Sequence, residues 1–172
     1  EKLMKAISKS LKKNDPNHLN LGIRYGYIEQ LDDELLRISK ESFDALSFNC
    51  YALSPDHEKM NHALEISGLP MIIGEYHFGT VDRGLAQSLW QVNSQKERGD
   101  AFRYYTENAF AHRGLIGTGW FRWIDQNING RTDGENYNCG FIDVTDRPYP
   151  YMVDAAIEAA KSLYEIHSGT KT

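Results

Sequence analysis

Polar and aromatic side chains gather at the ends of the four segments that we expect to form strands. In chain order they are Arg24 and Tyr25, then Asn49 and Tyr51, then Glu75, Tyr76 and His77, and finally Trp120, Arg122, Trp123 and Asp125. Parallel strands bring their carboxyl ends to one edge of a sheet, where α/β enzymes place their reactive groups. A carboxylate, a histidine and several aromatic rings at such an edge favour a site for a polar ligand.

Glu75 is the residue in this set with the sharpest chemical meaning. It ends the apolar run 71–74, and a carboxylate at the end of a buried strand costs free energy unless it is paired or functional. One interpretation is a nucleophile that attacks the anomeric carbon of a sugar and forms a glycosyl-enzyme. The other is a structural carboxylate bonded to Arg24 or Arg122. The residues alone leave both open.

The two residues that follow, Tyr76 and His77, can either orient Glu75 or contact substrate hydroxyls. A histidine beside a carboxylate is also often a hydrogen-bonded structural residue. A metal site is not favoured, because Glu75 and His77 lack a clear third ligand. His57 and His62 do not have the spacing that places two ligands on one helical face. We therefore expect neither a metal nor another cofactor.

Two tryptophans follow the fourth expected strand. An indole ring offers a flat face to the C–H groups of a sugar and an N–H to its hydroxyls. We expect this platform role for Trp120 and leave Trp123 between platform and core filler.

The segment 129–138 is polar, with glycines suited to tight turns. It can cover the site and bind hydroxyls through Arg131, Glu135 and Asn136, or it can be a solvated surface loop. Cys139, which follows it, has no clear base partner and is expected to be a small buried residue rather than a nucleophile.

Periodicity predicts the elements that must position these residues. Helices are expected at 2–13, 31–39, 55–68, from Ser94 through Phe110, and after Pro150 as far as Leu163; strands are expected at 19–25, 45–51, 69–75 and 115–120. Ser94 with Glu97 three residues later has capping-box spacing. This alternation of strands and helices predicts an α/β fold with parallel strands and right-handed crossovers.

Two α/β architectures suit four strand–helix units: an open doubly wound sheet and half of a TIM barrel. An open sheet uses strand ends only near its switch point, whereas all four ends are polar here, which favours the barrel. A half barrel leaves two unpaired strand edges, so we expect a second copy of the chain or a missing N-terminal half to complete it.

Composition limits the remaining possibilities. Hydrophobic residues make up 41% and charged residues 25% of the 172 residues, which predicts one globular domain over 1–172. The formal net charge is -5 without a basic block, which argues against a nucleic-acid partner or an anionic membrane surface. The two cysteines are too few for a disulfide scaffold. The chain opens on Glu1, so its start does not indicate a compartment.

Several of these motifs, in order along the chain, resemble one enzyme family. They are residues 74–80 (GEYHFGT), 82–84 (DRG), 117–121 (GTGWF), 130–131 with 133–137, and 140–144 (GFIDV). They are similar to the seventh and eighth strands of bacterial beta-agarase-type glycoside hydrolases, a group of retaining TIM-barrel enzymes in the clan that also holds many beta-galactosidases. The resemblance implies that the four strands are barrel strands five to eight, and that Glu75 is the nucleophile.

The resemblance further implies a beta-linked galactan such as agarose, or another beta-galactoside, as substrate, and a secreted or periplasmic location. This sequence departs from the family in one feature. In the family, the acid/base Glu follows the fourth barrel strand, usually directly after an Asn. No Asn-Glu pair follows an expected strand in this sequence. Glu29 lies too far into its loop. A retaining mechanism needs two carboxyl groups about 5–5.5 Å apart.

Three alternatives therefore stay open. The chain could be a non-catalytic carbohydrate-binding half barrel. It could be an enzyme in which two copies close one barrel and Asp125 or Glu135 serves as the acid. It could also be an open-sheet protein of unrelated function.

Overall fold

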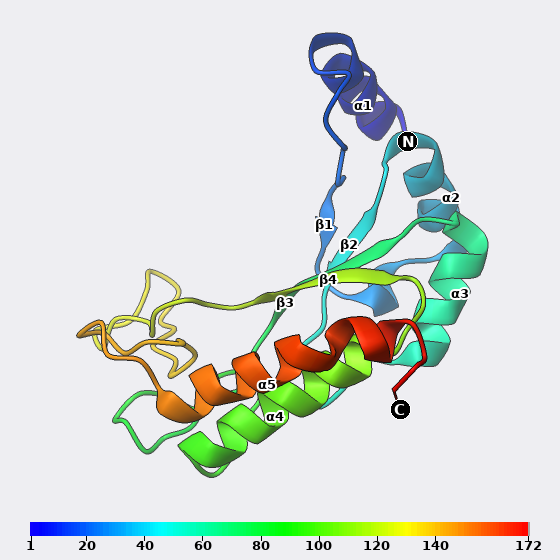
Figure 1. Cartoon of the computed structure of the whole chain (residues 1–172). Coiled ribbons are helices and arrows are strands. Elements are labelled where there is room, and N and C mark those ends of the chain that lie inside the picture. The colour runs from blue at the N-terminus through cyan, green and yellow to red at the C-terminus, as the bar shows by residue number, and fades with distance from the viewer. Residues whose placement is uncertain (172) are drawn as a thin grey trace. The chain divides into compact units, whose positions relative to one another are not determined.

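The computed structural model describes residues 1–171 (Figure 1). They divide into two compact units. The first unit comprises Glu1–Cys50, Asp56–Gly74 and Gly114–Thr118. The second comprises Tyr51–Pro55, Glu75–Arg113 and the described residues from Gly119 onward. Two strands begin in the first unit and end in the second.

The first unit contains the sheet and three α-helices. Its elements are α1 (Lys2–Asn14), β1 (Arg24–Tyr25), the short 3-10 helix η1 (Ile28–Gln30), α2 (Asp33–Ser42), β2 (Leu46–Asn49), α3 (His57–Ser67), and the first residues of β3 (Met71–Tyr76) and β4 (Leu115–Trp120). The strand order is β1-β2-β3-β4, and β1 pairs with β2 in parallel. The α/β class and the alternation of strands with helices are thereby confirmed.

Local signals set the ends of α3 as expected. The Asp56 side chain accepts hydrogen bonds from the backbone N–H groups of Glu58 and Lys59, both at 3.1 Å, which satisfies two donors of the first turn. Gly68 ends the helix with a φ of 66°, a left-handed conformation that glycine adopts without a steric penalty.

The first expected strand is much shorter than predicted. Only Arg24 and Tyr25 pair in the sheet, while the residues before them are held by side-chain hydrogen bonds. The Asn20 side chain accepts from Gly22 N–H at 3.1 Å, and Asp44 accepts from Asn20 N–H at 2.8 Å. Gly22 has a φ of 76°, which turns the chain away from strand geometry. Periodicity also missed η1.

Alternate strand residues, which point to one face of the sheet, form the core of the first unit. Leu46 and Phe48 of β2, Met71 and Ile73 of β3, and Leu115 of β4 are all fully buried. By contrast, the apolar stripe of α1 is exposed: Leu3, Ile7 and Leu11 keep 69%, 43% and 47% of their accessible surface.

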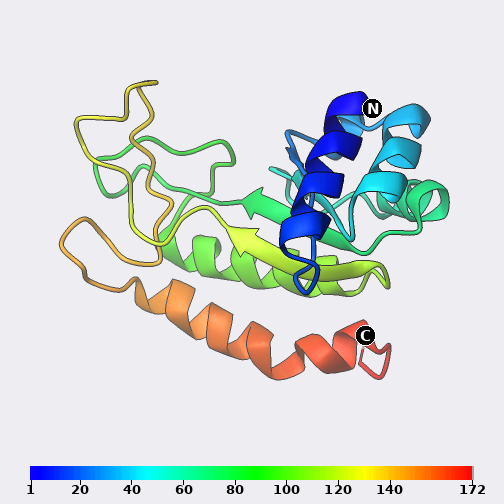
Figure 2. The same cartoon turned by 90° about the horizontal axis from the view of Figure 1, so that it is seen from above.

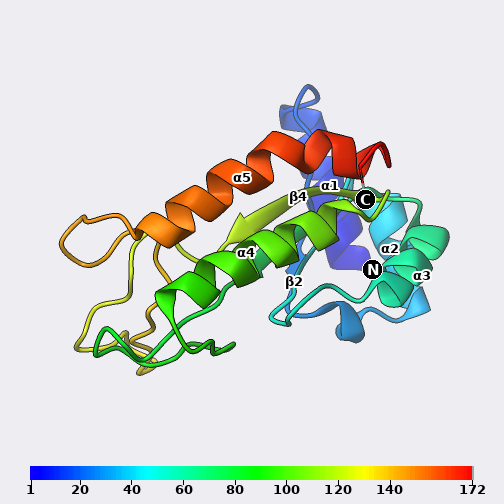
Figure 3. The same ribbon diagram turned by 60° about the horizontal axis from the view of Figure 1, so that its bottom comes forward.

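The second unit is built on two long helices that pack against each other, α4 (Gln95–Phe110) and α5 (Pro150–His167), as Figure 3 shows. The Ser94 side chain accepts from the Glu97 N–H at 3.1 Å and begins α4 as predicted. Glu97 reaches back to the Asn93 N–H at 3.0 Å, one residue before the expected position. Pro150 occupies the first turn of α5, where its missing N–H costs nothing.

Two loops of the second unit lie side by side (Figure 2). Ala86, in the loop after β3, donates its N–H to the Asn136 carbonyl and accepts from the Asn138 N–H, both at 3.1 Å. The two loops therefore brace each other. Among the helices of residues 1–171, none is long and apolar enough to span a membrane.

Candidate active site

Glu75 lies near the end of β3 in the second unit, with its side chain half-buried. The Tyr51 hydroxyl donates a hydrogen bond to Glu75 Oε2 at 2.7 Å. Because this hydrogen bond is short and directional, it fixes the orientation of the Glu75 carboxyl group. Gly74, directly before it, is required by a close approach: a Cβ there would lie 2.5 Å from Cδ of Arg24.

His77 is almost completely buried, at 1% exposure. Its Nδ1 lies 2.9 Å from the Phe121 carbonyl, and its Nε2 accepts from the Leu89 N–H at 3.1 Å. Burial is the main cause that lowers the pKa of His77 to about 4; the hydrogen bond to the Phe121 carbonyl acts against it, and the charge of Arg98 adds to it. Both ring nitrogens are engaged by backbone, so this geometry favours the orienting role over direct contact with hydroxyls.

Tyr76 points to the opposite side of β3 from Glu75, as alternate strand residues do. It is 1% exposed, its hydroxyl lies 2.7 Å from Thr106 Oγ1, and its ring stacks on Tyr105 at 4.1 Å. The prediction that Tyr76 contacts substrate is at odds with this burial, because the ring is part of the packing around α4.

The two tryptophans differ in the face that they offer. Trp120 is half-buried, and its indole N–H donates to the Cys139 carbonyl at 2.7 Å. Trp123 keeps 68% of its surface and stacks on Phe141 at 6.0 Å between ring centres. Trp123 thus offers the more open indole face.

Asp125 belongs to a buried network rather than to the surface; it is 3% exposed. Its Oδ1 accepts from the Gly140 N–H at 2.6 Å, and its Oδ2 accepts from the Tyr149 hydroxyl at 2.6 Å and from Asn138 Nδ2 at 2.9 Å. Burial, with the bond to Asp125, raises the pKa of Tyr149. The Asp125 carboxylate is therefore occupied by internal donors, which opposes both its predicted roles, in sugar binding and as the acid.

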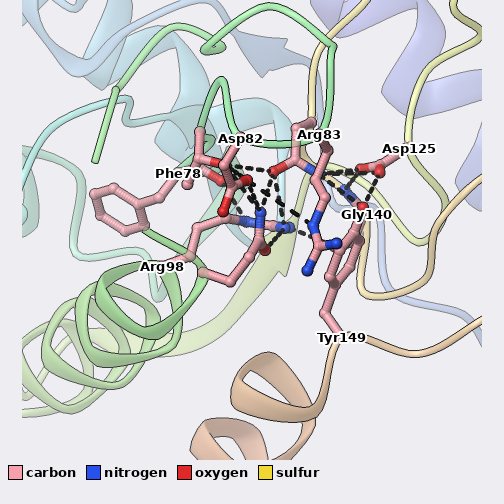
Figure 4. Close-up of polar contacts among 10 residues, drawn as sticks. Phe78, Asp82, Arg83, Arg98, Asp125, Gly140 and Tyr149 are labelled. Atoms are coloured by element: carbon pink, nitrogen blue, oxygen red, sulfur yellow. Dashed lines mark hydrogen bonds and ion pairs between the residues drawn. The ribbon is translucent and has the colours of Figure 1, made fainter. Parts of the chain in front are cut away.

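Arg98 stands at the other end of this network and is fully buried (Figure 4). Its Nε donates to the Phe78 carbonyl at 3.0 Å, its Nη1 to Gln95 Oε1 at 2.8 Å, and its Nη2 to the Gly140 carbonyl. The guanidinium carbon lies 4.9 Å from the centre of the Tyr149 ring. We call Arg98, Gln95, Asn138, Asp125 and Tyr149 the Arg98–Asp125 network.

The importance of Arg98 was not predicted, although one signal was present. Arg98 falls on the same helical stripe as Phe102, Tyr105 and Ala109, all buried residues of α4. A charged side chain on an apolar stripe must be bonded internally, and periodicity alone shows that much.

The loop residues predicted to bind hydroxyls brace one another. Arg131 contacts Asp133 at 2.7 Å and Glu135 at 3.1 Å, while Gln126 donates to Glu135 at 2.8 Å. Gly130 and Gly134, with φ of 81° and 88°, shape the turns at the tip. Asn136 donates weakly to the Ile128 carbonyl at 3.5 Å, and Arg131 remains exposed at the surface.

Two more predicted residues complete the inventory. Asn49 ends β2 in the first unit, and its side chain is half-buried. Burial raises the pKa of the Cys139 thiol to about 12, which fits a small buried residue. Within residues 1–171, no group of three His, Cys, Asp or Glu side chains is placed to hold a metal ion.

Comparison with known proteins places the chain among the homologues of glycoside hydrolases, although no protein-family model matches it. The relatives are beta-agarases. Beta-agarase A of Vibrio sp. (strain JT0107) is 36% identical over 165 residues, which are 92% of this chain and 16% of that enzyme. The solved structure of PfGH50B has 36% identity and a TM-score of 0.91, and covers 96% of this chain and 24% of its own. A solved exo-beta-agarase has 34% identity and a TM-score of 0.88; the match covers 96% of this chain and 22% of that enzyme's chain.

The chain is therefore homologous to a segment of the beta-agarases. It spans about a sixth of the length of the curated relative.

Proposed function

We propose that the chain is the C-terminal half of the TIM barrel of a retaining glycoside hydrolase, with β1–β4 as barrel strands five to eight. Homology to beta-agarases supports this, as does the position of β1 and β4 as the edge strands of the sheet. A second copy or an N-terminal half would pair with those edges, and the exposed stripe Leu3, Ile7 and Leu11 on α1 suits further packing.

One observation carries the proposal: a half-buried glutamate near the end of a parallel strand, with a tyrosine hydroxyl bonded to its carboxylate. In this mechanism Glu75 attacks the anomeric carbon. The new bond to a Glu75 oxygen forms as the glycosidic bond breaks, and water then releases the sugar from the ester. The Tyr51 hydroxyl orients the nucleophile before the attack.

The departing oxygen must receive a proton from a second carboxylic acid. Asp125 is saturated by internal donors, and Glu135 is held by Arg131 and Gln126. We therefore infer that neither serves as the acid, and that the acid lies on the half that completes the barrel.

The proposed substrate is a beta-linked galactan such as agarose, because the relatives are named beta-agarases. The indole face of Trp123 suits stacking on a sugar ring, while Arg131, Glu135 and Asn136 offer hydrogen bonds to hydroxyls.

A mechanism-based label tests the nucleophile without requiring the acid. An aryl 2-deoxy-2-fluoro-beta-galactoside whose phenol leaves without protonation should esterify Glu75, seen as one added fluorosugar by intact mass and located by peptide mapping. Glu75→Gln should abolish the label, whereas Glu158→Gln, a change at an exposed carboxylate of α5 paired with Lys161, should retain it. Labelling of any other residue, or no labelling of the chain with or without the half that completes it, contradicts the proposal. Sugar binding that survives without labelling would instead identify a binding module.

A further inference from the structure

The His77 ring contacts Tyr51, the residue that orients Glu75, and the His77 ring is itself held in place. Its ring meets the Tyr51 ring in an edge contact, with centres 4.8 Å apart and planes at 61°. The same Tyr51 donates its hydroxyl to Glu75 Oε2 at 2.7 Å. A shift of His77 would therefore move the tyrosine that orients the carboxylate.

Backbone groups determine both the position and the tautomer of His77. The Phe121 carbonyl can only accept, so His77 Nδ1 carries the proton. The Leu89 N–H can only donate, so His77 Nε2 carries none. A second proton on Nε2 would point at the Leu89 N–H and break that contact. The two bonds tie together segments that follow β3 and β4.

Aromatic neighbours complete the cage around this ring. Phe121 and Tyr137 have ring centres 5.8 Å from that of His77, at 46° and 79°. With Tyr51, three rings from three separate segments surround an imidazole that is 1% exposed. Such packing leaves one orientation for the ring.

We propose that His77 is a positioning residue: fixed by the backbone of Phe121 and Leu89, its ring holds the Tyr51 hydroxyl on the Glu75 carboxylate. This role rests on the proposed function, because holding Tyr51 on Glu75 serves catalysis only if Glu75 is the reacting carboxylate. The geometry itself does not depend on that chemistry.

The first test uses the unmodified chain. A long-range 1H–15N spectrum of the imidazoles between pH 5 and 7.5 should show His77 with Nδ1 protonated and Nε2 unprotonated throughout. Its resonances are assigned by their loss in His77→Phe, or by nuclear Overhauser contacts to Tyr51 and Tyr137 if that variant does not fold. A protonated Nε2 anywhere in this range overturns the proposal.

The second test measures Tyr51 directly. With tyrosine labelled at Cζ, the Tyr51 resonance should shift in His77→Phe in the same direction as in Glu75→Gln, which replaces the carboxylate that accepts its hydrogen bond. His62→Phe is the matched control, since His62 is an exposed histidine of α3 bonded to Asp33. Leu36→Ala, a buried change in the first unit, controls for lost stability alone. Neither control should move the resonance.

An unmoved Tyr51 resonance in a folded His77→Phe overturns the positioning role. Neither measurement involves a sugar, so a failure here is distinct from a failure of Glu75 labelling.

Discussion

Glu75 and Asp125, two of the acidic residues of the second unit that are predicted to act on substrate, have sharply different surroundings. Asp125 is 3% exposed and accepts from Asn138, Gly140 and Tyr149. Glu75 is half-buried and is oriented by Tyr51. The comparison shows that the type of residue after a strand does not determine its role. A carboxylate surrounded by internal donors anchors loops, whereas an accessible and oriented one is suited to chemistry.

The buried charge of Arg98 explains why every polar group of the Arg98–Asp125 network needs a hydrogen-bond partner. Burying a guanidinium costs several kcal/mol unless every donor finds an acceptor. Here two backbone carbonyls, Gln95 and the face of Tyr149 provide that compensation. The Arg98–Asp125 network can therefore tolerate little substitution.

The largest expected effect comes from removing the Arg98 side chain from the Arg98–Asp125 network. Arg98→Ala should lower the free energy of unfolding by about 3–5 kcal/mol, because buried acceptors and the Asp125 charge lose their partner. Arg103→Ala, which removes an exposed pair with Glu107 on the same helix, should cost less than about 1 kcal/mol. Urea unfolding followed by circular dichroism gives both values. Equal losses would mean that the network does not stabilise the fold.

The next largest effect is the pH dependence of the free energy of unfolding, which we expect to come from His77, close to Glu75. The folded pKa of His77, about 4, lies below its ordinary value of 6.5, so the unfolded chain binds more protons between these limits. Stability is therefore complete above pH 6.5 and falls as the pH drops toward 4, by about 3 kcal/mol in total.

Urea unfolding at several pH values measures this slope. His77→Phe should be flatter than the unmodified chain over the same range, whereas His62→Phe should keep the full slope. A His77→Phe slope as steep as that of the unmodified chain would assign the acid sensitivity to other groups.

The smallest effect is the direct comparison of the two carboxylates by isosteric amides. Asp125→Asn should destabilise the protein by about 2 kcal/mol, since an amide presents donor hydrogens to donor neighbours. Glu75→Gln should change stability by less than about 0.5 kcal/mol yet abolish labelling by the fluorosugar. Thermal unfolding and intact mass separate the two outcomes, and a reversal of their order would exchange the assigned roles.

Local signals predicted most of the scaffold. Asp56 and Gly68 bound α3, Ser94 begins α4, and the apolar run before Glu75 is a buried strand, as their sequences indicate. The first strand was overestimated because hydrogen bonds from Asn20 and Asp44 replace sheet pairing there. These bonds join residues whose proximity no periodic pattern records.

The site was predicted less completely, for the same reason. The position of Glu75 follows from its strand, but the partners of Asp125 lie 13 to 24 residues away along the chain. The exposure of Trp123, compared with Trp120, likewise depends on which loop atoms reach each indole ring. Long-range contacts of this kind require the folded coordinates.

The loop between Asp125 and Asn138 is pinned at both ends, while its turns at Gly130 and Gly134 project from that base. Natural variation can therefore concentrate in residues 131–135 without disturbing the scaffold. Descendants of one ancestor could exchange these few side chains and acquire new sugar preferences while keeping the same core. A library randomised there should yield mostly folded proteins.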